Sequence, residues 1–297
     1  PRARALLLTA PMDTVTRIHS VRERVAEWRR AGARIGFVPT MGNLHKGHLS
    51  LLTRAAERAD RVVVSVFVNP LQFGPSEDFN RYPRTLEHDT ELLKKSRADL
   101  LFTPTAFEMY PMGVERTSLI DVPELSGILE GQVRPGHFAG VATVVAKLFN
   151  IVQPDVAVFG EKDYQQLMII RRMVQDLCMP IGIEGGPIVR DHDGLALSSR
   201  NQYLSPGERN RASRLYDTLR HVRQRILEGQ HRYTEVEALA MRELTTAGFE
   251  PDYVSVRRPA DLMPPRVGDE EVVVLAAARL GRTRLIDNLL VRLDAKR

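Results

Sequence analysis

The stretch that decides the fold of this chain is Phe37-Val38-Pro39-Thr40-Met41-Gly42-Asn43-Leu44-His45-Lys46-Gly47-His48-Leu49. The apolar residues before Pro39 predict a short buried strand, and the apolar spacing after residue 47 predicts an amphipathic helix. A turn with two glycines and two histidines joins them. Because the first backbone N–H groups of a helix have no partner within it, this order of strand, turn and helix is typical of phosphate binding.

Two histidines make this turn a candidate catalytic site. His45 and His48 are three residues apart, so they would share one face of the first helical turn. Their ring N–H groups could donate to phosphate oxygens as charge builds on the phosphorus. A single histidine would more commonly satisfy a turn, and two could share a metal ion. A metal needs a further ligand, which no nearby cysteine or HExxH pattern supplies, so the pattern favours phosphate.

Strand and helix patterns alternate on both sides of the turn. Strands are predicted at 34–38, 62–68, 99–102 and 156–159, with a short one at 117–122. Helices are predicted at 14–31, 47–59, 85–97, 136–152 and 163–177. Apolar strands that alternate with helices predict an α/β fold with a parallel sheet covered on both faces. Segments 40–48, 69–72 and 160–166 each follow a strand, so we expect them at the edge where ligands bind.

A change of pattern after Gly185-Gly186-Pro187 predicts a second domain. The length of 297 residues is long for one core. Helical patterns at about 205–228 and 233–246 precede short strands at 252–257, 271–278 and 283–287. We therefore expect an N-terminal extension at 1–11, an α/β domain at 12–188 and a smaller α+β domain at 189–297. The glycine pair predicts a flexible entry into the smaller domain.

The composition limits the class of partner. The formal net charge of +5 is spread along the chain, which argues against nucleic acid and suits an anionic small-molecule substrate. The single cysteine, Cys178, leaves no internal disulfide within this sequence, and its helical apolar pattern predicts a buried side chain. With no secretory signal and no apolar run of membrane-spanning length, we expect a cytoplasmic protein with no membrane partner.

Two further polar segments could complete a nucleotide site. Gly160-Glu161-Lys162-Asp163 would place a cation for phosphate at a strand end, with Asp163 for ribose hydroxyls or for helix capping. Leu197-Ser198-Ser199-Arg200-Asn201 offers two hydroxyls and a guanidinium that can bind phosphate in a bidentate manner. The plain alternatives are a helix start with solvated charges and a polar turn.

Amide side chains could hold a second substrate. Gln72 comes just after a strand end, and Gln166 lies one turn into a helix. They could orient the hydroxyl and carboxylate groups of a small polar molecule, whereas as surface residues they would be unremarkable. Asp89, Glu91 and the basic residues at 94–97 are interpreted as the solvated face of a helix.

Taken in order, the segments of this chain resemble the pantoate–β-alanine ligase family, the pantothenate synthetases. The segments that carry the resemblance are Pro39-Thr40-Met41-Gly42-Asn43-Leu44-His45-Lys46-Gly47-His48, Phe67-Val68-Asn69-Pro70-Leu71-Gln72-Phe73, Tyr82-Pro83-Arg84-Thr85, Arg134-Pro135-Gly136-His137-Phe138, Gly160-Glu161-Lys162-Asp163-Tyr164-Gln165-Gln166 and Asp193-Gly194-Leu195-Ala196-Leu197-Ser198-Ser199-Arg200-Asn201. The match extends from about Met12 to Leu285-Ile286-Asp287-Asn288, and residues 1–11 lie outside it. The HxGH element alone is shared with other nucleotidylyltransferases and class I aminoacyl-tRNA synthetases, whereas the ordered set is far more specific.

The resemblance implies an ATP-dependent ligase that works in two steps. ATP and (R)-pantoate would give pantoyl adenylate and pyrophosphate, and the amine of β-alanine would then attack, giving pantothenate and AMP. The resemblance also implies Mg²⁺ with the ATP, a Rossmann-like domain with a smaller C-terminal lid, and a homodimer. No protein ligand for the metal is assigned.

The resemblance assigns roles residue by residue. The residues carried over to ATP are Met41, Gly42, Asn43, Leu44, His45, Lys46, Gly47, His48, Gly160, Glu161, Lys162, Asp163, Val189, Leu197, Ser198, Ser199 and Arg200. Gln72 carries over to pantoate and β-alanine and Gln166 to pantoate, with Asn69 beside that pocket. His48 is the family's proton donor, and His45 and Lys162 complete the predicted catalytic set. One departure is Gly186, where we would expect an apolar residue.

Three other functions share parts of this pattern. Another adenylyl- or cytidylyltransferase would use the same HxGH turn without the paired glutamines. A class I synthetase fragment would usually carry lysines where this chain has Leu197-Ser198-Ser199-Arg200, and it would need a basic RNA-binding face. A non-catalytic nucleotide-binding protein would need no second anionic pocket.

Overall fold

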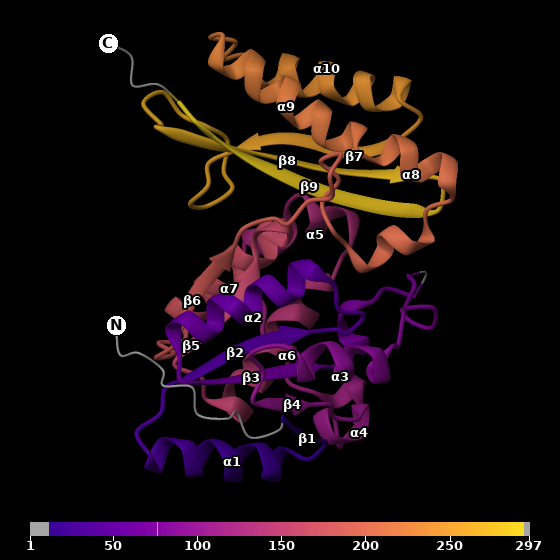
Figure 1. The fold of residues 1–297 in the computed structure, drawn as a ribbon. Coiled ribbons are helices and arrows are strands. Elements are labelled where there is room, and N and C mark those ends of the chain that lie inside the picture. The colour runs from indigo at the N-terminus through magenta and orange to yellow at the C-terminus, as the bar shows by residue number, and fades with distance from the viewer. Residues whose placement is uncertain (1–11, 76, 294–297) are drawn as a thin grey trace.

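The strand that precedes the histidine turn lies inside a six-stranded parallel sheet, as predicted. The computed structural model describes residues 12–75 and 77–293, so the expectation for residues 1–11 lies outside the described residues (Figure 1). The sheet has the order β1-β4-β3-β2-β5-β6. Its strands are β1 Asp13–Val15, β2 Ile35–Thr40, β3 Arg61–Val66, β4 Leu100–Phe102, β5 Val156–Gly160 and β6 Gly182–Gly186.

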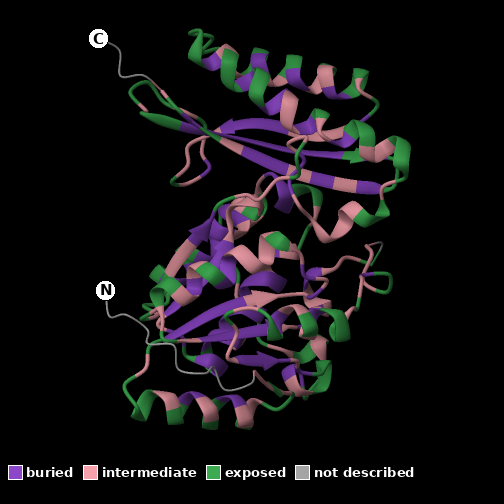
Figure 2. Cartoon of the chain, viewed as in Figure 1, coloured by how far each residue is buried: buried purple, intermediate pink, exposed green. Residues whose placement is uncertain are grey.

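Helices cover both faces of this sheet (Figure 2). They are α1 Ile18–Arg30, α2 Lys46–Arg58, α3 Leu86–Lys94, α4 Ala106–Met109, α5 Glu130–Val133, α6 His137–Val152 and α7 Tyr164–Asp176. Successive strand residues point to opposite faces. Phe37 and Val63 therefore belong to the core that contains α1, α6 and α7, whereas Val38 and Val64 belong to the core of α2 and α3.

The rest of the chain forms a three-stranded antiparallel sheet with helices on one face (Figure 1). Its elements are α8 Pro206–Ala212, α9 Arg214–Leu227, α10 Tyr233–Thr246, β7 Glu250–Arg257, β8 Glu271–Leu280 and β9 Thr283–Arg292. In β8, Val272 and Val274 pack with the helices, but Val273 and Leu275 belong to the core of the parallel sheet. The two faces of one strand thus serve two cores, which joins the halves of the molecule.

Some local predictions were wrong. Val15 belongs to β1, not to a helix, because residues 13–15 pair in parallel with β4. The described residues 117–122 form no strand; the backbone N–H of Ile120 donates instead to Thr143 Oγ1 on α6, at 2.8 Å. Cys178 is exposed, since it lies in the turn after α7 and not in the core. Within the described part of the chain, no helix is long and apolar enough to cross a bilayer.

Strand β6 was missed because its sequence is rich in glycine. Gly185 and Gly186, interpreted above as a flexible entry segment, pair in register with Phe159 and Gly160 of β5 and are buried. A Cβ on Gly186 would lie 2.2 Å from Leu51 Cδ2 on α2. The absence of a side chain there therefore allows α2 to pack closely on the sheet, which also explains the departure from an apolar residue.

A second close approach sets the position of the short helix Pro70–Gln72, called η1. It packs on α6 at Gly140, where a Cβ would lie 2.3 Å from the carbonyl oxygen of Leu71 and 2.8 Å from Gln72 Cα. These are backbone atoms, so a larger residue cannot be accommodated by a side-chain rotation. Gly140 therefore fixes how deep Gln72 sits in the molecule.

We predict that Gly140→Ala lowers the free energy of unfolding by about 1–3 kcal/mol, because η1 must move off α6. Urea denaturation measures the change. The matched control is Gly207→Ala in α8, where no described atom lies within 4 Å of the added Cβ. Equal unfolding free energies for the two variants would contradict the proposed close packing.

Candidate active site

Segments 40–48, 69–72 and 160–166 meet at the carboxyl ends of the parallel strands, as predicted. They line a cavity of about 220 Å³ together with residues 187–189 and 197–200. The predicted site residues that line it are Met41, His45, Gly47, His48, Asn69, Gln72, Gly160, Lys162, Asp163, Gln166, Val189, Leu197, Ser198, Ser199 and Arg200. The described residues Gly42, Asn43, Leu44, Lys46 and Glu161 lie outside this lining.

The two histidines cap α2 reciprocally. His45 is the N-cap residue, and its Nδ1 accepts the backbone N–H of Gly47 at 3.1 Å. His48 Nδ1 accepts the backbone N–H of His45 at 3.3 Å. A neutral imidazole has one acceptor and one donor nitrogen, so these partners place the hydrogen of each ring on Nε2. The helix cap therefore sets the tautomer of both candidate catalytic groups.

Both rings are neutral at pH 7. Burial, with Lys162 as the next cause, lowers the pKa of His45 to about 4. Burial, followed by His45 and Lys162, lowers the pKa of His48 to about 3. The ring centroids lie 4.1 Å apart, so two protonated rings would also repel each other. The turn thus offers two neutral N–H donors next to one ammonium group.

Asp89 supports this turn from α3, which corrects the prediction of a solvated side chain. It is fully buried, and its carboxylate accepts the backbone N–H groups of Asn43 at 2.9 Å and Leu44 at 2.7 Å. The hydroxyl of Thr85 donates to it as well, at 3.2 Å. The N–H groups of Asn43 and Leu44, expected to bind nucleotide, are therefore already occupied. Spacing could have indicated that Asp89 is buried, because it lies four residues before the buried Leu93 and therefore on the same face of the helix.

Asn69 orients the amide of Gln72. Its Nδ2 donates to Gln72 Oε1 at 3.1 Å and to the carbonyl oxygen of Gly140 at 3.1 Å. Its Oδ1 accepts the hydroxyl of Tyr110 at 2.7 Å. With its oxygen held by Asn69, Gln72 directs its amide nitrogen along the cavity toward Met41 Sδ, at 3.1 Å. Asn69 lines the cavity, but its polar atoms are used to hold Gln72.

A half-buried chain of polar side chains holds the backbone of Gln72. Arg134 binds the carboxylate of Glu77 at 2.6 and 2.7 Å and donates to His137 Nε2 at 3.0 Å. Because arginine can only donate, His137 must carry its hydrogen on Nδ1, which lies 2.8 Å from the carbonyl oxygen of Gln72. Burial lowers the pKa of His137 to about 4. In the sequence analysis, Arg134 and His137 belong to a family segment with no assigned role, and Glu77 is not singled out.

The segment that follows β6 closes the cavity. Ser199 Oγ donates to the carbonyl oxygen of Asn43 at 3.1 Å, and Asn43 Nδ2 donates to the carbonyl oxygen of Ser199 at 3.3 Å. The guanidinium of Arg200, predicted to bind phosphate, forms a bidentate ion pair with Asp78 at 2.9 and 3.0 Å and lies 5.7 Å from the ring of Tyr82. A phosphate bound by Arg200 would therefore share it with Asp78.

Part of the cavity lining is apolar. Helix α6 supplies Val141, Val144, Val145 and Leu148, and the end of β5 supplies Phe159. The helical pattern predicted this face as ordinary core, since apolar residues that line a cavity have the same spacing as those that fill one. The cavity lining thus combines polar side chains for charged groups with apolar side chains for carbon atoms.

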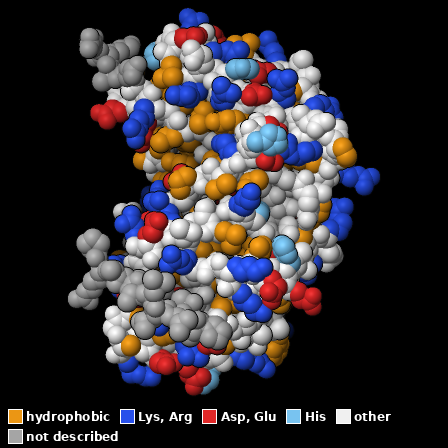
Figure 3. Space-filling view, in the orientation of Figure 1, with side chains coloured by type: hydrophobic (Ala, Val, Ile, Leu, Met, Phe, Trp, Pro, Cys, Tyr) orange, Lys and Arg blue, Asp and Glu red, His pale blue; other side chains and the backbone are white. Residues whose placement is uncertain are grey.

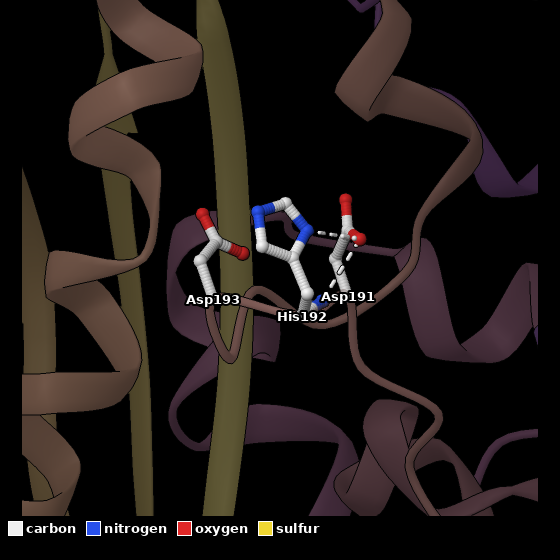
Figure 4. Close-up of side chains that lie close together, drawn as sticks. All are labelled: Asp191, His192 and Asp193. Carbon is white, nitrogen blue, oxygen red and sulfur yellow. Dashed lines mark hydrogen bonds and ion pairs between the residues drawn. The ribbon is translucent and has the colours of Figure 1, made fainter.

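Asp191, His192 and Asp193 form a second polar cluster, in a loop before residues 197–200 (Figure 4). Their ligand atoms lie within 4.8 Å of one another, the spacing that a metal ion needs. Both carboxylates, however, bind the guanidinium of Arg209, at 2.6 and 2.5 Å. Arg209 already supplies the positive charge of this cluster, which is a structural tie between the loop and α8.

The covered parallel sheet, the cavity at its strand ends and the paired histidine donors beside a lysine define a nucleotide-binding α/β enzyme of the HxGH type. The family model described as pantoate-beta-alanine ligase matches residues 13–290. The chain belongs to this family, which confirms the resemblance inferred from the ordered segments and sets aside the other three functions.

Similar proteins agree with this assignment. A pantothenate synthetase from Pseudomonas putida is 56% identical over 285 residues, which cover 96% of this chain and 99% of that protein. The crystal structure of pantothenate synthetase from Thermus thermophilus has a TM-score of 0.87 at 47% identity, covering 94% and 99% of the two chains. A pantoate-beta-alanine ligase from Francisella tularensis, complexed with beta-gamma ATP and beta-alanine, has a TM-score of 0.79 at 34% identity, covering 94% and 97%.

We predict that Asp89→Asn destabilises the protein by about 1–3 kcal/mol, because an amide nitrogen would face a buried backbone N–H that has lost its acceptor. Urea denaturation measures the change. The control is Glu91→Gln on the same helix, whose pair with Lys94 is exposed and should contribute little to stability. A similar small loss in both variants would show that Asp89 does not support the turn.

We predict that His137 makes stability depend on pH. The folded protein keeps the ring neutral down to pH 4, whereas the unfolded chain takes up a proton near the ordinary histidine pKa of 6.5. The unfolded state therefore binds more protons, and stability is lost as the pH falls from 6.5 toward 4. His137→Gln should reduce the slope of unfolding free energy against pH, near pH 5, by about 1 kcal/mol per pH unit. His19→Gln, at an exposed position on α1, should leave the slope unchanged, and equal slopes in all three proteins would contradict this origin.

Proposed function

We propose that the cavity binds ATP beside (R)-pantoate, forms pantoyl adenylate, and then admits β-alanine to give pantothenate and AMP. The observation that carries this assignment is the composition of the cavity lining. Lys162 and two neutral histidine donors line the same cavity as two glutamines and an apolar face of α6. Such a cavity fits a nucleotide phosphate next to a small, branched hydroxy acid.

In the first step, two anions must approach each other. The carboxylate of pantoate attacks the α-phosphorus of ATP, and pyrophosphate leaves. The ammonium group of Lys162 offsets the repulsion, and the Nε2–H groups of His45 and His48 donate to oxygens that gain charge. Because His48 is neutral, its part is hydrogen-bond donation to the phosphate oxygens, with Nδ1 kept in the helix cap.

The proposed pantoate pocket is formed by other residues of the same lining. Gln72 and Gln166 supply amide groups for the hydroxyl and carboxylate groups of pantoate, and Asn69 keeps the Gln72 amide in one orientation. The quaternary carbon of pantoate carries two methyl groups, which fit against Val141 and Val145 of α6. The bound adenylate is shielded from water by residues 187–189 and 197–200, which suits a reactive mixed anhydride.

We further propose that Mg²⁺ enters with the phosphates of ATP. The carboxylate of Asp163 lines the cavity beside Lys162, and Mg²⁺ is commonly bound by one or two carboxylates together with substrate phosphates. The ion would neutralise phosphate charge during the transfer.

The second half of the chain, 189–297, is proposed as a smaller domain that covers the nucleotide.

A homodimer is also part of this proposal. Phe107, Met112 and Leu119 are 70%, 69% and 62% exposed, more than expected for large apolar side chains of a monomer.

Lys and Arg side chains are scattered among acidic and apolar ones on the face drawn in Figure 3, which suits a small-molecule substrate better than nucleic acid. We place the protein in the cytoplasm, where ATP is supplied.

The test of the function is a substrate-omission assay with ATP, Mg²⁺, pantoate and β-alanine. Pyrophosphate release should require pantoate, and AMP release should require both pantoate and β-alanine. Formation of AMP that does not depend on both organic substrates would contradict the proposed reaction.

Analytical ultracentrifugation of the same preparation tests the homodimer. Activity after removal of Mg²⁺ with a chelator tests the metal.

We predict that His48→Ala lowers the rate of adenylate formation by about 100- to 1000-fold, as the loss of one donor to developing charge does elsewhere. The partner variant is His48→Asn, whose side-chain oxygen can still accept the backbone N–H of His45 but which has no Nε2–H. Both variants should lose pyrophosphate release, while His48→Asn should unfold at a temperature closer to that of the wild type. Near-normal turnover in His48→Asn would rule out Nε2–H donation.

A further inference from the structure

The turn that carries Lys162 is held from the antiparallel sheet. Asn288, on β9, donates from Nδ2 to the carbonyl oxygen of Glu161 at 2.8 Å and to that of Lys162 at 3.0 Å. Because both partners are acceptors, the amide can have only one orientation here. Residues 161–163 form a single short turn between β5 and α7, so these two hydrogen bonds reach a large part of its backbone.

Asn288 is itself fixed in place. Its backbone N–H donates to Asp287 Oδ1 at 2.8 Å, and its carbonyl oxygen accepts from Arg190 at 3.3 Å. Arg190 also forms a bidentate ion pair with Asp287 at 2.6 and 2.9 Å, and its guanidinium lies 3.8 Å from the ring centroid of Tyr216. Asp287 and Asn288 are 4% and 6% exposed, so this network is shielded from water.

The strand next to β9 adds rigidity. Leu275 of β8 pairs with Asn288, and its side chain belongs to the core of the parallel sheet. The backbone that carries Asn288 is thus tied to the same core as α6 and α7. Asn288 cannot move away from the Lys162 turn without disturbing this packing.

We propose that Asn288 is a positioning residue for Lys162. On this proposal, which rests on the proposed function, the antiparallel sheet sets the direction of the catalytic ammonium group in addition to covering the nucleotide. Loss of the Asn288 amide removes the donor that the antiparallel sheet supplies to two carbonyl groups of the 161–163 turn, and the turn loosens. The ammonium group then spends less time in line with the phosphate, which slows adenylate formation more than it weakens ATP binding.

The test compares three variants. Asn288→Ala removes the donor, and Asn288→Asp keeps nearly the same shape but replaces the donor with an acceptor. The control is Tyr164→Phe, because the Tyr164 hydroxyl also donates across the two halves, to the carbonyl oxygen of Pro259 at 3.2 Å, without touching residues 161–163. Pyrophosphate release is measured for each variant over a range of ATP and pantoate concentrations.

Both Asn288 variants should lower kcat by 10- to 100-fold and change KM for ATP by less than threefold, whereas Tyr164→Phe should change kcat by less than twofold. A loss confined to KM, or an equal loss in Tyr164→Phe, would overturn the proposal. Melting temperatures show whether each variant is folded. If Asn288→Ala is not folded, the comparison rests on Asn288→Asp.

A second measurement separates this proposal from the proposed reaction. Amide hydrogen exchange of the substrate-free protein should be faster over residues 160–166 in both Asn288 variants and unchanged in Tyr164→Phe. Unchanged exchange over 160–166 would overturn the positioning role even if the wild type makes pantothenate. A wild type without activity, combined with faster exchange in the variants, would overturn the reaction and keep the structural link.

Discussion

The reciprocal cap between His45 and His48 is the constraint on which the site depends. It uses both Nδ1 atoms to begin α2, so the position, tautomer and charge of the rings are set together. Beneath them, Asp89 binds the two preceding N–H groups and keeps the turn in its left-handed conformation, with φ of +83° at Gly42 and +51° at Asn43. A phosphate site is usually described as a helix start with unused donors. Here the cap already uses the N–H groups of His45 and Gly47, and the two rings add their Nε2–H donors to the helix start.

Gln72, which we propose to bind pantoate, is held in place by other residues. Asn69 holds the side-chain amide of Gln72, and His137 binds its backbone carbonyl oxygen. The absence of a side chain at Gly140 allows the backbone of Gln72 to lie close to α6. This arrangement places flexible side chains on a backbone that has little freedom. The family segment 134–138 lies outside the cavity lining, and Arg134 reaches Gln72 through His137 and the backbone carbonyl.

Much of the fold and of the site could be predicted from the sequence, for physical reasons. Apolar strands such as 62–66 and the periodic face of α6 are local signals, and residues that follow parallel strands must meet at one edge. The sequence could not show that Asp89 is buried. An aspartate that accepts two backbone hydrogen bonds in the interior is the same residue type as an aspartate in solvent. Strand β6 was missed because its five residues include three glycines, which are uncommon in strands; one of them, Gly186, lies against Leu51 of α2.

The two faces of β8 have a consequence for the growing chain during synthesis. The parallel sheet is complete at Gly186, but the strand whose Val273 and Leu275 cover part of its core begins only at Glu271. At the usual rates of translation, that interval is roughly five to twenty seconds. For this time the first half of the molecule presents an uncovered apolar surface at the ribosome. The nascent chain is therefore exposed to wrong contacts until the last three strands emerge.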